Sequence, residues 1–321
     1  MNNIYVFGSK GQDGQLLTYL LKEKYKNSRL ILFNSKYVEV FLNSNFIKKI
    51  YLNNQNEYLS IVASLIEEFK PKLIFYLAAV HISSQEKEIN IDFNRSAFVN
   101  YFLPFHILNQ CILYKLKPRF LFASSSLIFS DSDVTPQYEL LERKPSCIYS
   151  KQKVLTENYL KTLLNFDIPI YVVILYNHES HLRSEKFFTK KVISSCNAVV
   201  SDQFNKAAKP IRLFNPDSLI DMGYANEYVK AMINLINNAI PGDYIFATKK
   251  PIKVKDFVDV VMDYYSLSED IFVYLETKPR FKVPLIGDNL KVYKSIGWRP
   301  DLYREKLAVQ LCNDYKSKFK N

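Results

Sequence analysis

Glycine is scarce in this sequence, with seven copies among 321 residues. Three of the seven lie in one short stretch, GSKGQDG at positions 8–14. The β-type run Ile4–Phe7 precedes this stretch, and leucines at helical spacing follow it. A dinucleotide diphosphate binds where a glycine turn joins a strand to a helix, because glycines let the phosphates approach the positive helix N-terminus. The stretch therefore predicts a dinucleotide site, with an ordinary strand-to-helix turn as the alternative.

Cysteine is also rare, and its four copies are scattered without the Cys-x-x-Cys spacing of zinc sites. We therefore expect reduced thiols, no bound metal and a cytoplasmic protein. No apolar run approaches the roughly 20 residues that a membrane-spanning helix requires. The N-terminus lacks the basic and then apolar pattern of a signal peptide. These absences argue against a membrane partner.

Basic residues outnumber acidic ones, and the formal net charge is +11 at pH 7. Such a balance suits nucleic acid, a membrane surface or an anionic small molecule. The lysines are spread along the chain without a long basic block. We therefore expect a nucleotide-bearing substrate and no nucleic-acid partner.

Segments typical of strands alternate with segments of helical period. Strands are expected at residues 4–7, 29–34, 47–52, 73–77, 120–123, 168–175 and 244–247. Helices are expected at residues 16–25, 58–69, 94–116 with a kink at Pro104, 149–164, 187–195, 225–238, 254–265 and 305–319. The alternation predicts an α/β fold with a Rossmann-type, doubly wound parallel sheet. We expect an NAD(P)-binding domain at 1–170 and a smaller α/β substrate domain at 171–321, with elements that cross back.

A tyrosine and a lysine lie four residues apart at the start of an expected helix, at Tyr149 and Lys153. This spacing places both side chains on one face of the helix. A phenol has an ordinary pKa of about 10, and a nearby lysine cation lowers it by favouring the phenolate. The pair can then take a proton from an alcohol while hydride leaves the same carbon. The serines at 124–126 end an expected strand and can offer a hydroxyl to the same oxygen.

With these features in order, the chain resembles the extended short-chain dehydrogenase/reductase family and, more narrowly, the GDP-mannose 4,6-dehydratases. The glycine turn follows that group and includes its Gln12-Asp13 pair. Asn100 matches a helix asparagine of the family. Four further segments resemble it: LAA at 77–79, YNHES at 176–180, NPDSL at 215–219 and IGWRP at 296–300.

The resemblance implies roles for individual residues. The expected catalytic residues are Ser125, Tyr149 and Lys153. The expected cofactor contacts are Gly8, Gly11, Gln12, Asp13, Gly14, Asn34, Ser35, Lys36, Asn53, Asn54, Leu77, Ala78, Ala79, His81, Tyr149, Lys153, His178 and Arg183. The expected substrate contacts are Ser126, Asn177, Glu179, Lys190 and Asn215. Enzymes of this group pair through two helices, so a homodimer or higher homo-oligomer is expected.

The sequence also departs from the group at the catalytic serine cluster. The dehydratases carry a threonine and, two residues later, a glutamate, whereas this chain has Ser125 and Leu127. Elimination of water from C5–C6 needs one group that removes the C5 proton and another that protonates the leaving hydroxyl. A leucine can do neither. Another acid, Glu179 or Asp131, is the alternative source of that function.

Further departures leave the cofactor open between NAD and NADP. The stretch NSK at 34–36 lacks the aspartate that favours NAD, and Lys36 alone offers a weak hold on a 2′-phosphate. Asn53 replaces an acidic residue expected against the adenine amine. At the nucleotide end of the substrate, Ile220 and Lys278 replace two expected arginines.

The residues therefore predict an NAD(P)-dependent enzyme that oxidises C4 of a GDP-linked, manno-configured hexose or heptose to the 4-keto sugar without dehydration. A 4,6-dehydratase, a 4-ketosugar reductase and an epimerase are alternatives. A non-enzymatic relative that binds a nucleotide is a more distant alternative, because the Ser125, Tyr149 and Lys153 set is intact.

Overall fold

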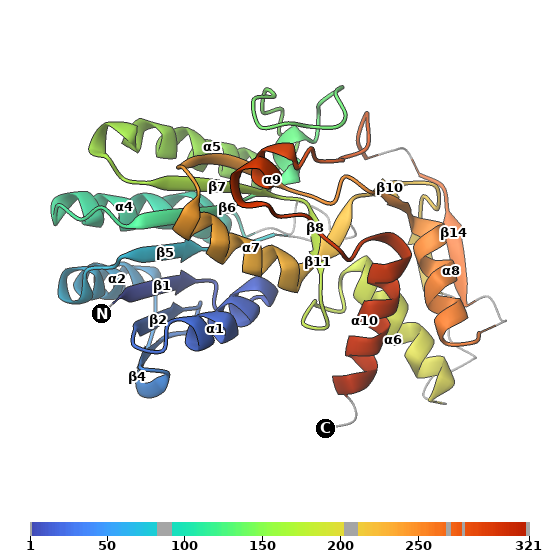
Figure 1. Ribbon diagram of the computed structural model, residues 1–321, viewed down its shortest axis with the longest axis horizontal. Coiled ribbons are helices and arrows are strands. Elements are labelled where there is room, and N and C mark those ends of the chain that lie inside the picture. The colour runs from blue at the N-terminus through green and yellow to red at the C-terminus, as the bar shows by residue number, and fades with distance from the viewer. Residues whose placement is uncertain (1, 82–91, 202–210, 268–270, 278–279, 319–321) are drawn as a thin grey trace. The chain divides into compact units, whose positions relative to one another are not determined.

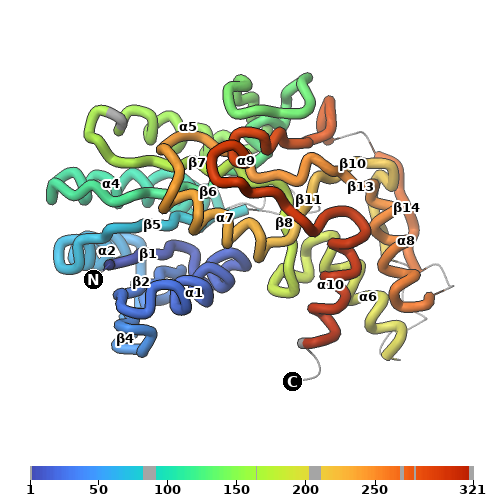
Figure 2. The backbone as a smooth tube through the Cα atoms, viewed as in Figure 1, coloured from blue at the N-terminus to red at the C-terminus, as the bar shows by residue number. Residues whose placement is uncertain are grey.

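The computed structural model describes residues 2–81, 92–201, 211–267, 271–277 and 280–318 (Figure 1). The chain forms two compact units and passes between them more than once. Its path can be followed along the tube in Figure 2. Unit 1 comprises Met1–Ile128, Pro145–Leu175 and Val229–Tyr244. Unit 2 comprises Phe129–Lys144, Tyr176–Tyr228 and Ile245–Asn321.

An eight-stranded sheet organises unit 1, with the strand order β12-β7-β6-β5-β1-β2-β3-β4. The strands are β1 Asn3–Phe7, β2 Arg29–Phe33, β3 Tyr37–Leu42, β4 Asn45–Tyr51, β5 Leu73–Tyr76, β6 Arg119–Ser125, β7 Ile170–Leu175 and β12 Gly242–Phe246. From β7 through β2 the neighbouring strands run parallel. The predicted α/β fold with a Rossmann-type parallel sheet is confirmed. The strand order reverses between β1 and β5, and ligands bind at such a switch point in open α/β sheets.

The central strands are apolar on both faces, as expected for parallel strands covered by helices on each side. Residues 4–7 of β1 and 73–76 of β5 are all buried. Aromatic rings fill much of this core: Phe7 stacks on Phe33 with ring centroids 4.1 Å apart, and Tyr76 stacks on Phe122 at 6.1 Å. This packing fixes the carboxyl ends of β1, β2, β5 and β6 at one edge of the sheet.

Helices cover both faces of this sheet. Helices α2 Gln55–Phe69, α4 Leu103–Leu113 and α5 Ile148–Thr162 pack side by side. Helices α1 Gln12–Lys24 and α7 Ala225–Asn238 lie in front of the strands in the view of Figure 1. The Tyr25 hydroxyl at the end of α1 donates to Asn237 of α7 over 3.0 Å. The doubly wound arrangement follows.

The helix expected at 94–116 with a kink at Pro104 is instead interrupted at residues 98–102, just before that proline. It consists of α3 Phe93–Ala97, a π-helical segment at Phe98–Phe102 and α4. Pro104 has no backbone N–H, so it cannot bond the Asn100 carbonyl four residues earlier. The hydroxyl of Thr156 on α5 donates to that carbonyl instead, over 2.7 Å. The irregular segment thereby ties α4 to α5.

The sequence expectation for the region after β2 was incomplete. One strand was expected at 47–52, whereas the structure has an antiparallel hairpin of β3 and β4 beside β2. Strand β3 alternates between buried and partly exposed side chains, with Val38 and Val40 buried. Strand β4 is the edge of the sheet and is largely exposed, so its sequence lacks a clear inward face.

Unit 2 contains short strands and helices around its own core. Its strands are β8 Asn177–Glu179, β9 Ile211–Phe214, β10 Leu219–Ile220, β11 Met222–Tyr224, β13 Ile252–Lys253 and β14 Phe272–Leu275. Its helices are α6 Phe188–Val200, α8 Val254–Tyr264, α9 Leu290–Ile296 and α10 Arg304–Lys318. Val192 of α6, Phe257 of α8 and Leu307 of α10 are fully buried in this core. No helix within the described ranges is long and apolar enough to span a membrane.

The buried carboxylate of Asp221 joins three segments of unit 2. It accepts hydrogen bonds from the backbone N–H groups of Thr248 at 2.8 Å, Lys249 at 3.0 Å and Gly287 at 3.1 Å. Burial raises the pKa of this carboxyl, while the three donors oppose that effect. The bonds fasten residues 248–249 and 287 to the residue that follows β10.

Candidate active site

The glycine turn after β1 is held by backbone hydrogen bonds. The N–H groups of Gly8 and Ser9 both donate to the Phe33 carbonyl, at 3.0 and 3.1 Å, and the N–H of Gly11 donates to the Gly8 carbonyl at 3.0 Å. Gly11 is the N-cap of α1 and supplies no side chain to the first helical turn. The start of α1 is therefore uncovered by side chains from its cap, as an approaching diphosphate requires.

The end of β5 lies against this turn. Gly8 has a φ of +86°, and a Cβ there would lie 2.7 Å from the Ala78 nitrogen. A Cβ on Gly14 would lie 2.2 Å from the Gly8 carbonyl oxygen. Asn100 secures the chain just after Ala79, because its amide accepts from the Val80 N–H at 2.9 Å and donates to the Val80 carbonyl at 3.0 Å. Only glycine fits positions 8 and 14.

The end of β2 carries an amide with an unused donor. Oδ1 of Asn34 accepts from the N–H groups of Lys36 and Tyr37, at 3.0 and 3.2 Å. Its Nδ2 is buried and has no hydrogen-bond partner among the described residues. Ser35 and Lys36 are exposed next to it. An unpaired buried donor costs free energy, so this amide is suited to donate to a ligand. Such a ligand would lie along the strand ends, beside the glycine turn.

The asparagines predicted near the adenine have separate structural roles. Asn54 is the N-cap of α2, and its Oδ1 accepts from the Glu57 N–H at 2.9 Å. The N–H of Asn53 donates to the Glu57 carboxylate at 2.8 Å, and the Asn53 residue is exposed. Asn54 therefore caps a helix, while the side chain of Asn53 faces solvent.

Tyr149 and Lys153 lie one turn apart on α5, and both are buried. The helix starts at a capping box in which Cys147 and Ser150 exchange hydrogen bonds, which fixes the first turn that carries Tyr149. Nζ of Lys153 donates to the Ala123 carbonyl of β6 at 2.8 Å and lies 5.7 Å from the centre of the Tyr149 ring. The His81 ring contacts Tyr149 edge-on, with ring centroids 4.6 Å apart.

Burial lowers the pKa of Lys153 to about 7, and the negative charge of Glu157 opposes this shift. A lysine with such a pKa changes charge within the physiological pH range. A lysine cation at this distance favours the charged form of a neighbouring phenol.

The three serines at 124–126 have different environments in the structure, which the sequence could not reveal. Ser124 is buried, and its hydroxyl donates to the carboxylate of Glu157. The Oγ of Ser125 accepts from the Leu127 N–H at 3.2 Å, so its own hydroxyl proton can be given to a ligand. Ser126 is buried at the start of a 3-10 turn, Ser126–Phe129. Of the three, Ser125 is the partly exposed one.

Of the predicted residues in unit 2, Glu179, Arg183 and His178 lie in or just after β8. Oγ1 of Thr189 donates to Glu179 at 2.6 Å, and Arg183 pairs with the same carboxylate at 3.5 Å. His178 is buried, and its Nδ1 lies 2.7 Å from the Tyr176 carbonyl oxygen. Its ring stacks on Tyr228 with centroids 5.0 Å apart.

Three predicted substrate contacts in unit 2 differ in exposure. Asn177 is exposed at the start of β8. Nζ of Lys190 donates to the His181 carbonyl at 3.0 Å and is buried over the ring of Tyr315, 4.1 Å from its centre. Asn215 adopts a left-handed backbone, and its Oδ1 accepts from the Thr277 N–H at 2.7 Å. Lys278, at the predicted nucleotide end, lies outside the described residues.

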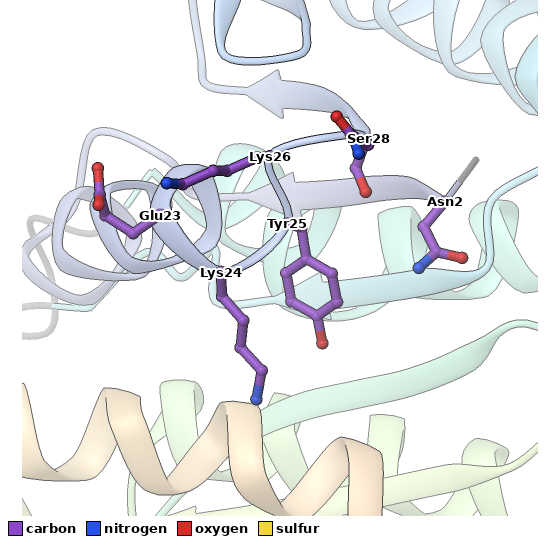
Figure 3. Close-up of a pocket in the computed structure, with 7 residues that line it drawn as sticks. Asn2, Glu23, Lys24, Tyr25, Lys26 and Ser28 are labelled. Atoms are coloured by element: carbon purple, nitrogen blue, oxygen red, sulfur yellow. The ribbon is translucent and has the colours of Figure 1, made fainter.

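A surface hollow of about 380 Å³ lies elsewhere on unit 1 (Figure 3). Its lining includes Asn2, Tyr25 and Ser28. Asn2 directly precedes β1 and Ser28 directly precedes β2, so the hollow lies at the amino ends of these strands. The glycine turn follows the carboxyl end of β1, and the hollow is therefore separate from the candidate site. Within the described ranges, no group of three His, Cys, Asp or Glu side chains is arranged to hold a metal ion.

Residues 5–310 match the family model described as GDP-mannose 4,6 dehydratase. The chain belongs to this family. Its relatives include GDP-mannose 4,6 dehydratase 2 of Caenorhabditis elegans, 27% identical, with 95% of this chain and 87% of that protein covered. The GDP-mannose 4,6-dehydratase of Yersinia enterocolitica is 24% identical, with 97% and 93% covered. The predicted resemblance is confirmed, and the protein is an enzyme of the nucleotide-sugar short-chain dehydrogenase/reductase type.

Solved structures share the fold at low identity. RMD from Pseudomonas aeruginosa, complexed with NADPH, has a TM-score of 0.81 and 15% identity, with 99% of this chain and 100% of that chain covered. A dTDP-glucose 4,6-dehydratase from Bacillus anthracis, in complex with NAD, has a TM-score of 0.79 and 14% identity, with 100% and 98% covered. A UDP-glucose 4-epimerase from Thermotoga maritima has a TM-score of 0.77 and 17% identity, with 99% of each chain covered.

The 3-10 turn after β6 is where the sequence predicted a departure from the GDP-mannose 4,6-dehydratases. Leu127 stands where the resemblance expects a glutamate, and the turn Ser126–Phe129 contains no acid. The two acids considered as replacements each have a cationic partner: Asp131 pairs with Lys282 at 2.9 Å, and Glu179 pairs with Arg183.

Sequence reasoning did not assign Glu157, which is buried on α5 and bonded to Ser124. A signal was present, because Glu157 follows Lys153 by four residues and therefore shares its helix face. An acid at that spacing on a helix surface is usually solvated, and only burial shows that this one is not.

The substitution Gly8→Ala tests the glycine turn. We expect it to abolish binding of a nicotinamide dinucleotide and to lower the melting temperature, because a Cβ would overlap the Ala78 backbone in a left-handed conformation. Gly297→Ala is the matched control, since Gly297 also has a positive φ, of +70°, but has nothing within 4 Å of an added Cβ. Strain alone costs about 1 kcal/mol. Equal losses in both variants, measured by thermal unfolding and dinucleotide titration, would contradict the close-approach argument.

Proposed function

We propose that the protein is an NAD(P)-dependent oxidoreductase that converts C4 of a GDP-linked, manno-configured hexose or heptose to the 4-keto sugar without eliminating water. The arrangement of α5 and β6 carries this proposal. Tyr149 and Lys153 are buried one turn apart on α5, and Lys153 is bonded to β6, the strand that ends at Ser125. Membership of the GDP-mannose 4,6 dehydratase family supports GDP as the nucleotide.

The cofactor is a nicotinamide dinucleotide, and the residues present fit it. The glycine turn at Gly8–Gly14 is suited to bind the diphosphate, and the unpaired Nδ2 of Asn34 is suited to donate to a ribose oxygen at the end of β2. A bound nicotinamide would accept hydride from C4. Solved structures of the same fold hold NADPH or NAD, so both forms enter the experiments below.

The chain's own residues supply the proton chemistry at C4. The Ser125 hydroxyl donates a hydrogen bond to the C4 oxygen, because its Oγ already accepts one from the Leu127 N–H. Tyr149, favoured as a phenolate by the Lys153 cation, removes the C4 hydroxyl proton as hydride leaves the carbon. The same set run backwards reduces a 4-keto sugar, with Tyr149 as the acid. A 4-ketosugar reductase is therefore the second candidate, and the direction is decided by product analysis.

The site lacks support for the elimination that follows C4 oxidation in a 4,6-dehydratase. A 4-keto group acidifies the C5 proton, but a base and an acid must still act at C5 and C6. Leu127 is apolar, and Asp131 and Glu179 are paired with cations. The proposal therefore ends the reaction at the ketone.

We also propose that the protein forms a homodimer through α4 and α5. Apolar side chains are exposed here: Phe102, which ends the π-helical segment before α4, and Leu155 of α5 are more than half exposed. Phe105 of α4 contacts Tyr159 of α5, with ring centroids 4.5 Å apart, so aromatic side chains link the two helices. Exposed apolar patches are typical of subunit contacts.

The reaction product tests the proposed function. Incubation with NAD or NADP and a panel of GDP-sugars should give one mole of reduced cofactor per mole of sugar. Mass spectrometry should find a product that has lost two hydrogens and no water. Tyr149→Phe should reduce turnover by at least about 100-fold and leave cofactor binding intact, because the phenol supplies only the proton transfer. A dehydrated product from the native protein would overturn the assignment.

The substitution Leu127→Glu tests why elimination is missing. We expect this variant to release some dehydrated 4-keto sugar, since the carboxylate restores a proton-transfer group in the turn after β6. Leu127→Gln is the control, because it has the same shape without an ionisable group. If neither variant gives dehydration while both still oxidise C4, more than residue 127 separates the two activities.

The homodimer is tested by Leu155→Lys, which places a charge on the exposed face of α5. We expect the variant to elute as a monomer at concentrations where the native chain is a dimer, because a buried unpaired charge opposes association. Ile240→Lys is the control, since Ile240 is also an exposed apolar residue but lies outside α4 and α5. Sedimentation that is identical for the native protein and both variants would argue against this interface.

A further inference from the structure

A carboxylate is buried on the catalytic helix without a place in the proposed C4 chemistry. Glu157 is 1% exposed and lies one turn beyond Lys153 on α5. The hydroxyl of Ser124 on β6 donates to its Oε1. Burying a carboxylate costs several kcal/mol unless the charge is paired and hydrogen-bonded. Such a residue placed beside a catalytic lysine calls for a physical reason.

Lys153 supplies this reason, because it is equally buried and would lose its charge without an opposite charge nearby. It is 1% exposed, its Nζ lies 4.5 Å from the centre of the Phe122 ring, and its hydrogen bond goes to the neutral Ala123 carbonyl. Burial lowers its pKa to about 7, and Glu157 is the charge that raises it. Removal of Glu157 would lower the pKa of Lys153 further and favour its neutral form.

The spacing on α5 decides which charge Tyr149 senses most. Lys153 lies four residues from Tyr149, about 6 Å along the helix axis, whereas Glu157 lies eight residues away, about 12 Å. The nearer cation therefore dominates the direct effect of the carboxylate on the phenol. Among the described residues, the titratable groups that interact with Lys153 are Tyr149 and Glu157, and the His81 ring contacts Tyr149 edge-on. The contacts from β6, Ala123 and Ser124, are uncharged.

We propose that Glu157 is a positioning residue of the C4 redox reaction: held by Ser124, it keeps Lys153 charged, and Lys153 in turn favours the phenolate of Tyr149. The kinetic consequence rests on the proposed function. The electrostatic consequence does not, because the ionisation of Tyr149 can be measured without a substrate.

The first test titrates Tyr149 in the purified full-length protein. The ultraviolet phenolate signal of Tyr149 is the difference between the native protein and Tyr149→Phe across the pH range. The same difference is taken between Glu157→Gln and the double variant Glu157→Gln/Tyr149→Phe. We expect the ionisation of Tyr149 to move up by about one pH unit or more in the Glu157→Gln background. An unchanged titration overturns the proposal.

Matched variants distinguish charge from packing. Thr156→Val removes a buried hydroxyl from the neighbouring position of α5, where it donates to the Asn100 and Gln152 carbonyls. This control should lower the melting temperature and leave the Tyr149 titration unmoved. Ser124→Ala should shift the titration in the same direction as Glu157→Gln by a smaller amount, and Glu157→Asp should restore it in part. If Glu157→Gln does not fold, the Ser124→Ala and Glu157→Asp shifts decide the matter, and their absence refutes the proposal.

The second test follows turnover against pH with whichever GDP-sugar is oxidised. Glu157→Gln should move the alkaline limb of kcat to lower pH, because Lys153 then loses its proton earlier, while KM for the sugar stays within about twofold. A uniform loss of kcat with an unmoved limb indicates a merely structural role and counts against the proposal. If no sugar in the panel turns over, the proposed function fails, and the Tyr149 titration still decides the role of Glu157.

Discussion

The contact between the backbone at Gly8 and the backbone at Ala78 is the constraint on which the cofactor end of this protein depends. No side chain fits between them, since a Cβ on Gly8 would lie 2.7 Å from the Ala78 nitrogen. The contact holds the ends of β1 and β5 together at the point where the strand order reverses. It also fixes the start of α1, because Gly14 packs against the Gly8 carbonyl. A chain with few glycines has kept three of them in this one turn.

A second constraint is the low-dielectric face of α5. Tyr149, Lys153 and Glu157 follow one another at intervals of one turn, and each is buried. Isolated, any of these groups would be neutral there, because burial disfavours the charged form. Here the Ser124 hydroxyl donates to the Glu157 carboxylate, and the Lys153 ammonium donates to the Ala123 carbonyl. These bonds and the opposite charges favour the charged forms. Burying these charged groups lowers the stability of the fold, as is usual where a side chain must have a perturbed pKa to act near neutral pH.

Hydride transfer at C4 and elimination of water place different demands on the site. In the proposed reaction, hydride transfer at C4 needs one polarised oxygen and one base, and these roles are proposed for Ser125 of β6 and Tyr149 of α5. Elimination needs further proton transfers at neighbouring carbons, and at the turn after β6 this chain offers Leu127. The fold that holds the cofactor is thus compatible with several outcomes, and a few side chains around the sugar select among them.

The sequence by itself determined the α/β alternation, the glycine turn, the family and the shared helix face of Tyr149 and Lys153, because each rests on local spacing. It did not reveal the β3–β4 hairpin, whose edge strand β4 has no buried face to create a pattern. It also could not rank Ser124, Ser125 and Ser126, which are identical as residues. Only the tertiary structure decided that Ser124 bonds Glu157, that Ser125 keeps a proton to donate, and that Glu157 is buried beside Lys153. Burial and hydrogen-bond direction arise from residues far apart in the chain, and so no local pattern could contain them.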